Sequence, residues 1–154
     1  MFPASDDPIL NPDLQWAPGS AGSVPDGAVE VDGAYVGRAH HDQGVIVGPV
    51  VCAESCCMIG YCGEQFNKDE YEVLLEPTDG RRLRWEPCDG SNMPEGAVEA
   101  GYLCSGHKLY VTRAKKDDKF IIGHMNTTHC VCCIPYQGAS CDCTDFQVLV
   151  VYSV

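Results

Sequence analysis

Two stretches of the chain share one pattern, VPDGAVE at residues 24–30 and MPEGAVE at residues 93–99. Their prolines are offset by 69 positions, since 94 − 25 = 69. In each stretch proline presets φ and glycine accepts positive φ, so a turn is predicted just before a short apolar segment. A turn-and-strand unit that occurs twice indicates an internal repeat.

The repeat extends outward from these turns in both directions. Trp16 precedes the first turn and Trp85 the second, and YVGRA at 35–39 matches YVTRA at 110–114. The offset there is 110 − 35 = 75, so the second copy carries 75 − 69 = 6 extra residues. The offset of 75 then continues to hold, for 45–48 with 120–123, 59–63 with 134–138, and 71–75 with 146–150. Matches in one order, with one length change, predict two copies of one unit.

The local pattern within each copy is that of short β-strands. Segments such as YEVLLEP and FQVLVVYSV are rich in Val, Tyr and Leu, and Gly, Pro, Asp and Asn bound them. No stretch shows a sustained apolar period of 3.6 residues. The sequence therefore predicts an all-β fold of two tandem repeats of short antiparallel strands.

The repeat also sets the expected division of the chain. We predict an N-terminal lead-in at 1–13, a first repeat at 14–77, a connector at 78–84 and a second repeat at 85–154. Half of a 154-residue chain buries too little apolar surface to be stable alone. The two repeats should therefore pack together, and an exchange of strands between them is an open alternative.

Composition narrows the range of partners. The chain has 10 Lys and Arg against 22 Asp and Glu, a net charge of −12, which repels phosphate backbones and anionic lipid. Nucleic-acid binding is therefore not expected. The chain has no run of 18 apolar residues and its first residues do not resemble a signal peptide, so no membrane insertion is expected. The predicted location is the cytoplasm, or a surface reached by unconventional export.

The order of these features resembles the DM9 repeat, over about residues 14–152. The shared features are the Trp, the turn with Pro and Gly-Ala, the YVxRA strand and the closing VL strand. The resemblance implies tandem β-rich repeats with intertwined or swapped strands. Some members are mannose-recognising lectins that dimerise, and tegument proteins of parasitic flatworms are similar. We therefore predict a non-enzymatic, cofactor-free homodimer that binds mannose-type glycans or glycoproteins.

The resemblance also implies candidate sugar-binding positions. In mannose-binding members, an Asp after the turn and a Lys after a Gly contact the sugar, where a carboxylate accepts bonds from hydroxyls and an ammonium donates them. Asp32 matches the Asp in the first half, but Pro49 replaces the Lys after Gly48. In the second half Leu103 takes the place of the Asp, and His124 that of the Lys.

A further carboxylate makes the first half the better candidate for a sugar site. Glu64 follows Tyr61-x-Gly63, and its counterpart in the second half is Ala139. The predicted carbohydrate-binding residues are therefore Asp32, Glu64 and His124, with strand exchange as the means of bringing His124 to Asp32. The two sites are expected to be unequal.

The 11 cysteines leave three interpretations open. Those around 52–62 and 130–143 could bind zinc together with His124 or His129, could form disulfides, or could be buried thiols. An odd number cannot pair fully, and no CxxC pair occurs twice, so we assign no metal ligand. The alternative function is a cysteine-rich structural, interaction or metal-binding protein of a parasite surface or tegument, with a degenerate sugar site.

Other polar residues have simpler interpretations. Arg38 and Arg113 hold matching strand positions, and a structural ion pair with Glu30, Glu72 or Glu99 is expected for Arg38 or its counterpart. The triplet His40-His41-Asp42 is predicted to lie in a loop, where it could bind metal or titrate near neutral pH. The chain lacks the GxSxG, HExxH and P-loop motifs, so no catalytic residues are assigned.

Overall fold

Short strands form almost all regular structure in the computed structural model, which describes residues 14–88, 93–126 and 128–153. In chain order the elements are β1 (Trp16–Ser20), β2 (Glu30–Val31), β3 (Ala34–His41), β4 (Gly44–Val51), the 3₁₀ turn η1 (Cys52–Glu54), β5 (Cys56–Tyr61), β6 (Glu64–Lys68), β7 (Glu70–Leu74), β8 (Arg81–Cys88), β9 (Glu99–Tyr102), β10 (Lys108–Lys116), β11 (Lys119–Met125), β12 (Cys132–Tyr136), β13 (Ala139–Cys143) and β14 (Phe146–Ser153). The all-β prediction is confirmed, and the predicted lead-in at 1–13 lies outside the described residues.

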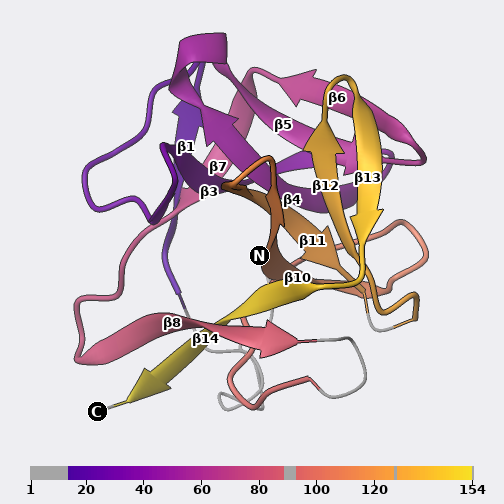
Figure 1. Ribbon diagram of the computed structural model, residues 1–154. Coiled ribbons are helices and arrows are strands. Elements are labelled where there is room, and N and C mark those ends of the chain that lie inside the picture. Colours follow the sequence, from indigo (N-terminus) through magenta and orange to yellow (C-terminus); the bar gives the residue numbers. More distant parts are fainter. Residues whose placement is uncertain (1–13, 89–92, 127, 154) are drawn as a thin grey trace.

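The strands of the two halves pair in the same order (Figure 1). In the first half β3 pairs with β2, β4 and β7, β5 pairs with β4 and β6, and β1 pairs with β7. In the second half β10 pairs with β9, β11 and β14, β12 pairs with β11 and β13, and β8 pairs with β14. Each pairing of one half therefore has a counterpart in the other. The division into repeats at 14–77 and 85–154 stays a prediction, and β8 begins inside the predicted connector.

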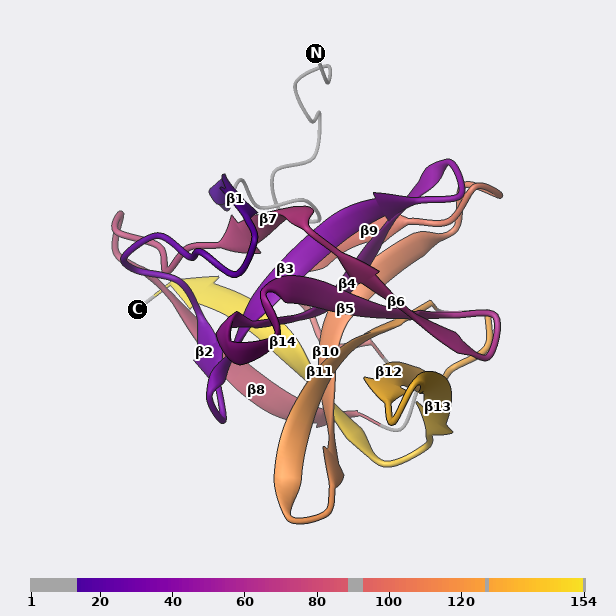
Figure 2. The ribbon, with the colours of Figure 1, turned by 90° about the horizontal axis from the view of Figure 1, so that it is seen from above.

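Two seams join the halves, as the view from above shows (Figure 2). At one seam Glu64 of β6 pairs with Ala139 of β13, and at the other Val45 of β4 pairs with Tyr102 of β9. These pairings close a ring of eight strands, β4-β5-β6-β13-β12-β11-β10-β9. In the described chain each strand also keeps a partner in its own half, so edge-to-edge pairing joins the halves without the exchange of whole strands.

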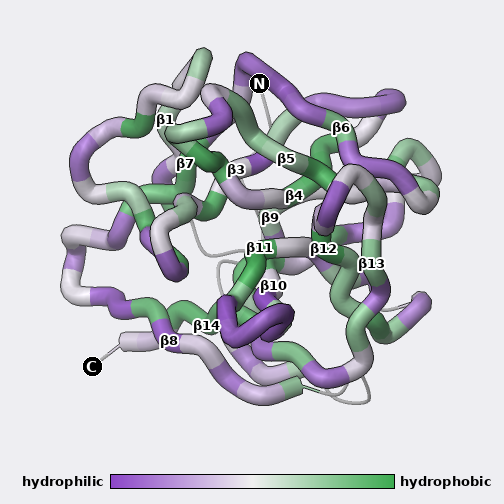
Figure 3. The backbone as a smooth tube through the Cα atoms, turned by 45° about the horizontal axis from the view of Figure 1, so that its top comes forward, coloured by the Kyte–Doolittle hydropathy of each residue, from purple (hydrophilic) through white to green (hydrophobic). Residues whose placement is uncertain are grey.

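One core cluster is built from matching residues of both halves. It includes Val36 with Val111, Val47 with Ile122, and Leu74 with Leu149. All six are at most 1 % exposed, and burying a Val, Ile or Leu side chain is worth about 1.5–3 kcal/mol. The shared core confirms that the halves pack together. Hydrophobic segments of β4, β5 and β11 lie toward the centre, and hydrophilic stretches mark the hairpin tips (Figure 3).

The prediction of a loop at residues 40–42 is wrong for His40 and His41. His40 and His41 are the last two residues of β3, paired with β4, and the tight turn falls on Asp42 and Gln43, both at positive φ. Because Asp readily adopts the left-handed region, the strand runs on to the residue before it. The Tyr61 hydroxyl donates to the Asp42 carboxylate at 2.7 Å and holds this turn against β5. His40 is thereby fixed on a strand, where it faces the groove described next.

Candidate functional site

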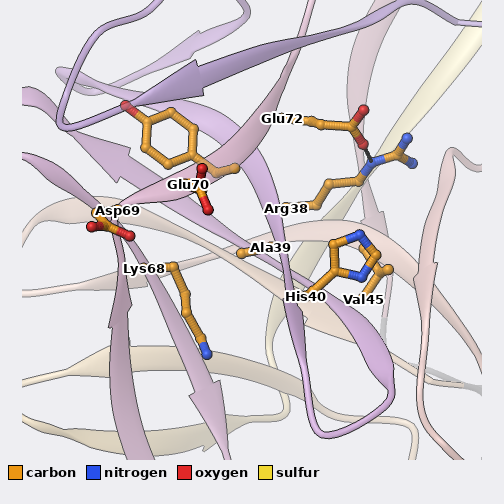
Figure 4. Close-up of a pocket in the computed structure, with 9 residues that line it drawn as sticks. Arg38, Ala39, His40, Val45, Lys68, Asp69, Glu70 and Glu72 are labelled. Atoms are coloured by element: carbon orange, nitrogen blue, oxygen red, sulfur yellow. Dashed lines mark hydrogen bonds and ion pairs between the residues drawn. The ribbon is translucent and has the colours of Figure 1, made fainter.

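Residues of the first half line a groove of about 450 Å³. Strands β3 and β7, the start of β4 and the β6–β7 corner form its walls (Figure 4). The residues that line it are Arg38, Ala39, His40, Val45, Lys68, Asp69, Glu70, Tyr71 and Glu72. Charged side chains therefore converge on a floor that includes Ala39 and Val45.

Arg38 is the most constrained charged residue of the groove. Its Nε donates to Glu72 at 2.9 Å, and its Nη1 donates to the Ala100 carbonyl of β9 at 3.0 Å. Its guanidinium carbon lies 4.1 Å from the centre of the Trp16 ring, a cation–π contact. The predicted ion pair is thus confirmed for Arg38 and Glu72. Because Ala100 belongs to the second half, the position of Arg38 depends on the packing of both halves.

Three further charged residues of the groove lie at the β6–β7 corner. Asp69 and Glu70 are exposed at the β6–β7 corner, and Lys68 is half-buried beside them. Figure 4 shows these three on one side of the groove, with Arg38, Glu72 and His40 on the other. Carboxylates accept bonds and Arg or Lys donates them, so this lining suits a ligand that carries several hydroxyl groups.

The second half repeats this arrangement around Arg113. Arg113 Nε donates to the Gln147 side chain at 2.8 Å, and the guanidinium lies 4.5 Å from the Trp85 ring. The centre of a second ring, that of Phe120, lies 4.0 Å from the guanidinium carbon of Arg113. Burial lowers the pKa of Arg113 from its ordinary value, and the nearby Asp32 carboxylate partly opposes that effect.

The structure places Asp32 in that second cluster. Asp32 belongs to the turn between β2 and β3, with φ of 46°, and its Oδ2 accepts a bond from the Phe120 backbone N–H at 2.8 Å. The Asp32 carboxylate thus links the first half to β11. Glu64 is exposed at the β6–β13 seam, outside the lining of the groove.

His124 lies inside the molecule, only 7 % exposed. Its ring donates to the Val47 carbonyl, while Nδ1 has no hydrogen-bond partner among the described residues. Burial lowers the pKa of His124 to about 4. His124 is four residues from Phe120 along β11, roughly 13 Å at strand rise, so Asp32 and His124 belong to different surroundings. The assignment of Asp32, Glu64 and His124 to one sugar site stays a prediction.

Sequence reasoning found part of the groove. It identified Arg38, Glu72 and Trp16, the first two as an ion pair and Trp16 as a marker of the repeat. It did not single out Asp69 and Glu70. The available signal was the matching Trp and Arg in both halves, because a residue type kept at two equivalent positions indicates a shared contact.

The eleven cysteines all lie in the described residues, and the structure shows no disulfide among them. Cys57 and Cys132, which hold matching positions, are fully buried, and burial raises the pKa of both thiols far above its ordinary value. Cys132 Sγ lies 3.0 Å from Thr112 Oγ1. The described ranges contain no group of three or more His, Cys, Asp or Glu side chains placed to hold a metal ion.

Comparisons with known proteins agree with the resemblance. A family model described as the DM9 repeat matches residues 30–143. Natterin-4 of Thalassophryne nattereri is 25% identical over 150 residues, which cover 90% of this chain and 34% of that protein. The crystal structure of the nematode sperm cell motility protein MFP2B shares the fold, with a TM-score of 0.73 at 14% identity over 97% of this chain and 50% of that one. The chain thus spans between a third and a half of the length of these two proteins. In its described part, no helix is long and apolar enough to cross a membrane.

Proposed function

The chain belongs to the DM9 repeat family, and from that membership we propose that it is a non-enzymatic, lectin-like carbohydrate-binding protein. The observation that carries the proposal is the groove of about 450 Å³ in which Arg38 is held between Trp16 and Glu72 beside exposed carboxylates. Fixed donors and acceptors over a small apolar floor suit a sugar, whose hydroxyl groups need both.

The proposed ligand is a neutral glycan of the mannose type. A net charge of −12 repels polyanionic glycans, and the groove offers carboxylates to hydroxyl groups rather than a cluster of cations. Homodimerisation is part of the proposal, because two linked sites raise avidity for a multivalent glycan without any new contact.

Glu72→Gln tests the groove directly. This substitution gives the first half the residue that the second half carries at Gln147, so the fold should tolerate it. It removes the charge that orients Arg38 and accepts from a hydroxyl, so affinity should fall at least tenfold, about 1.4 kcal/mol. The measurement is binding to a glycan array, followed by calorimetry with methyl α-mannoside.

Further measurements distinguish failure of the lectin proposal from an error in the position of the sugar site. The control Gln147→Glu, in the second half, should leave affinity unchanged. The residues indicated by the family resemblance, Asp32, Glu64 and His124, form the alternative location. If Asp32→Ala abolishes binding while Glu72→Gln does not, the site lies at the Arg113 cluster. A wild-type protein that binds no mannose-type glycan on the array defeats the lectin proposal.

A further inference from the structure

The two arginine clusters differ in the number of aromatic rings that contact the guanidinium, one ring at Arg38 and two at Arg113. Arg38 packs one face on Trp16 and lines the open groove. Arg113 packs on Trp85 and also has the Phe120 ring 4.0 Å from its guanidinium carbon. Lys115 contributes to the same cover, with Nζ 5.7 Å from the Phe120 ring.

The extra ring at Arg113 comes from Phe120, and the residue at the matching position of the first half is Val45. Val45 pairs with His40 in the β3–β4 hairpin, and Phe120 pairs with Lys115 in the β10–β11 hairpin. These registers match, since 120 − 45 and 115 − 40 both equal 75. Val45 forms part of the groove floor, whereas the larger Phe120 reaches over Arg113.

The polar groups around Arg113 are also engaged by the protein itself. Gln147 accepts the Nε bond, and the Asp32 carboxylate faces the arginine while it holds the Phe120 backbone. A sugar at this point would have to displace an aromatic ring and compete with a carboxylate already in use. Such a site is closed by its own side chains.

From these contacts we infer that each chain binds one mannose-type sugar, in the Arg38 groove, and that the residue at position 45 or 120 decides whether a half can bind. The inference rests on the proposed function and adds a binding stoichiometry and a specificity-determining position. Cross-linking of glycans would then need two chains, since a single chain offers one site.

Amide chemical shifts during titration with methyl α-mannoside test this inference. In the wild type, shifts are expected around His40, Lys68 and Glu70, with the matching region around Lys115 and Asp145 unchanged. Val45→Phe should lose binding at least tenfold. The second half carries Phe at this position, so the hairpin can hold that side chain, and unchanged shifts of the second half would confirm folding.

A second variant tests the closed half. Phe120→Val with Gln147→Glu gives the second half the two residues of the first, and a second set of shifts near Lys115 is expected. Failure to gain it, or equal shifts in both halves of the wild type, overturns the inference while leaving the lectin proposal intact. A titration in which no amide chemical shift changes also overturns the inference, and the glycan array then decides whether the proposed function fails as well.

Discussion

Replacing Gly48 by alanine should destabilise the protein by about 3 kcal/mol or more. A Cβ at this position would overlap the backbone carbonyl oxygen of Met58, where β4 passes over β5. A backbone oxygen cannot rotate away as a side chain can, so the two strands would have to separate. The free energy of unfolding, from urea titration followed by circular dichroism, measures the effect.

The matching position in the second half should behave in the same way. A Cβ at Gly123 would overlap the Cys133 carbonyl oxygen, where β11 passes over β12. The control is Gly63→Asn, because Gly63 has φ of 82° and open space around it, and Asn tolerates that conformation. The control should change stability by less than about 0.5 kcal/mol. Equal effects of Gly48→Ala and Gly63→Asn would show that the close approach is not required.

These two glycines illustrate why the sequence predicted the framework well. Gly48 and Gly123 lie in the matched segments 45–48 and 120–123, and a duplicated backbone crossing demands the same residue in both copies. The strands could also be predicted, because turn residues flank short segments that are rich in Val and Tyr. The apolar residues that form the shared core, such as Val36 and Val111, follow from the same matching.

The seams and the groove were beyond the same reasoning. The pairing of Glu64 with Ala139 joins residues 75 positions apart, and no local pattern specifies it. Val45 and Phe120 are both apolar residues suited to a strand, so hydropathy cannot tell the open half from the closed one. Only the distance between the Phe120 ring and Arg113 reveals the difference.

His124 shows how the fold sets the surroundings of a residue that the family pattern singled out. The resemblance placed His124 at the position of a ligand-binding lysine, among the predicted carbohydrate-binding residues. Strand alternation is the signal that could have located its side chain, because His124 shares a face of β11 with Ile122, which is fully buried. The structure therefore makes His124 a buried titratable group, which couples the stability of the fold to pH.

Stability should fall as the pH drops from 6.5 to 4, and His124 should account for about 3 kcal/mol of that loss. The folded pKa of about 4 lies below the unfolded value near 6.5, so the unfolded chain takes up the proton first. The contribution is therefore fully present above pH 6.5 and is lost as the pH falls toward 4. The measurement is the free energy of unfolding at pH 7 and at pH 4, in wild type and in His124→Leu.

The comparison isolates His124 because other groups titrate equally in both proteins. The variant should lose about 3 kcal/mol less than wild type between the two pH values. His107→Gln is the control, since His107 is exposed and contacts the Ser105 hydroxyl, and it should keep the wild-type dependence. If His124→Leu showed the same loss as wild type, His124 would have to be protonated in the folded core without penalty. That result would contradict the burial of Nδ1, which has no hydrogen-bond partner within the described part of the chain.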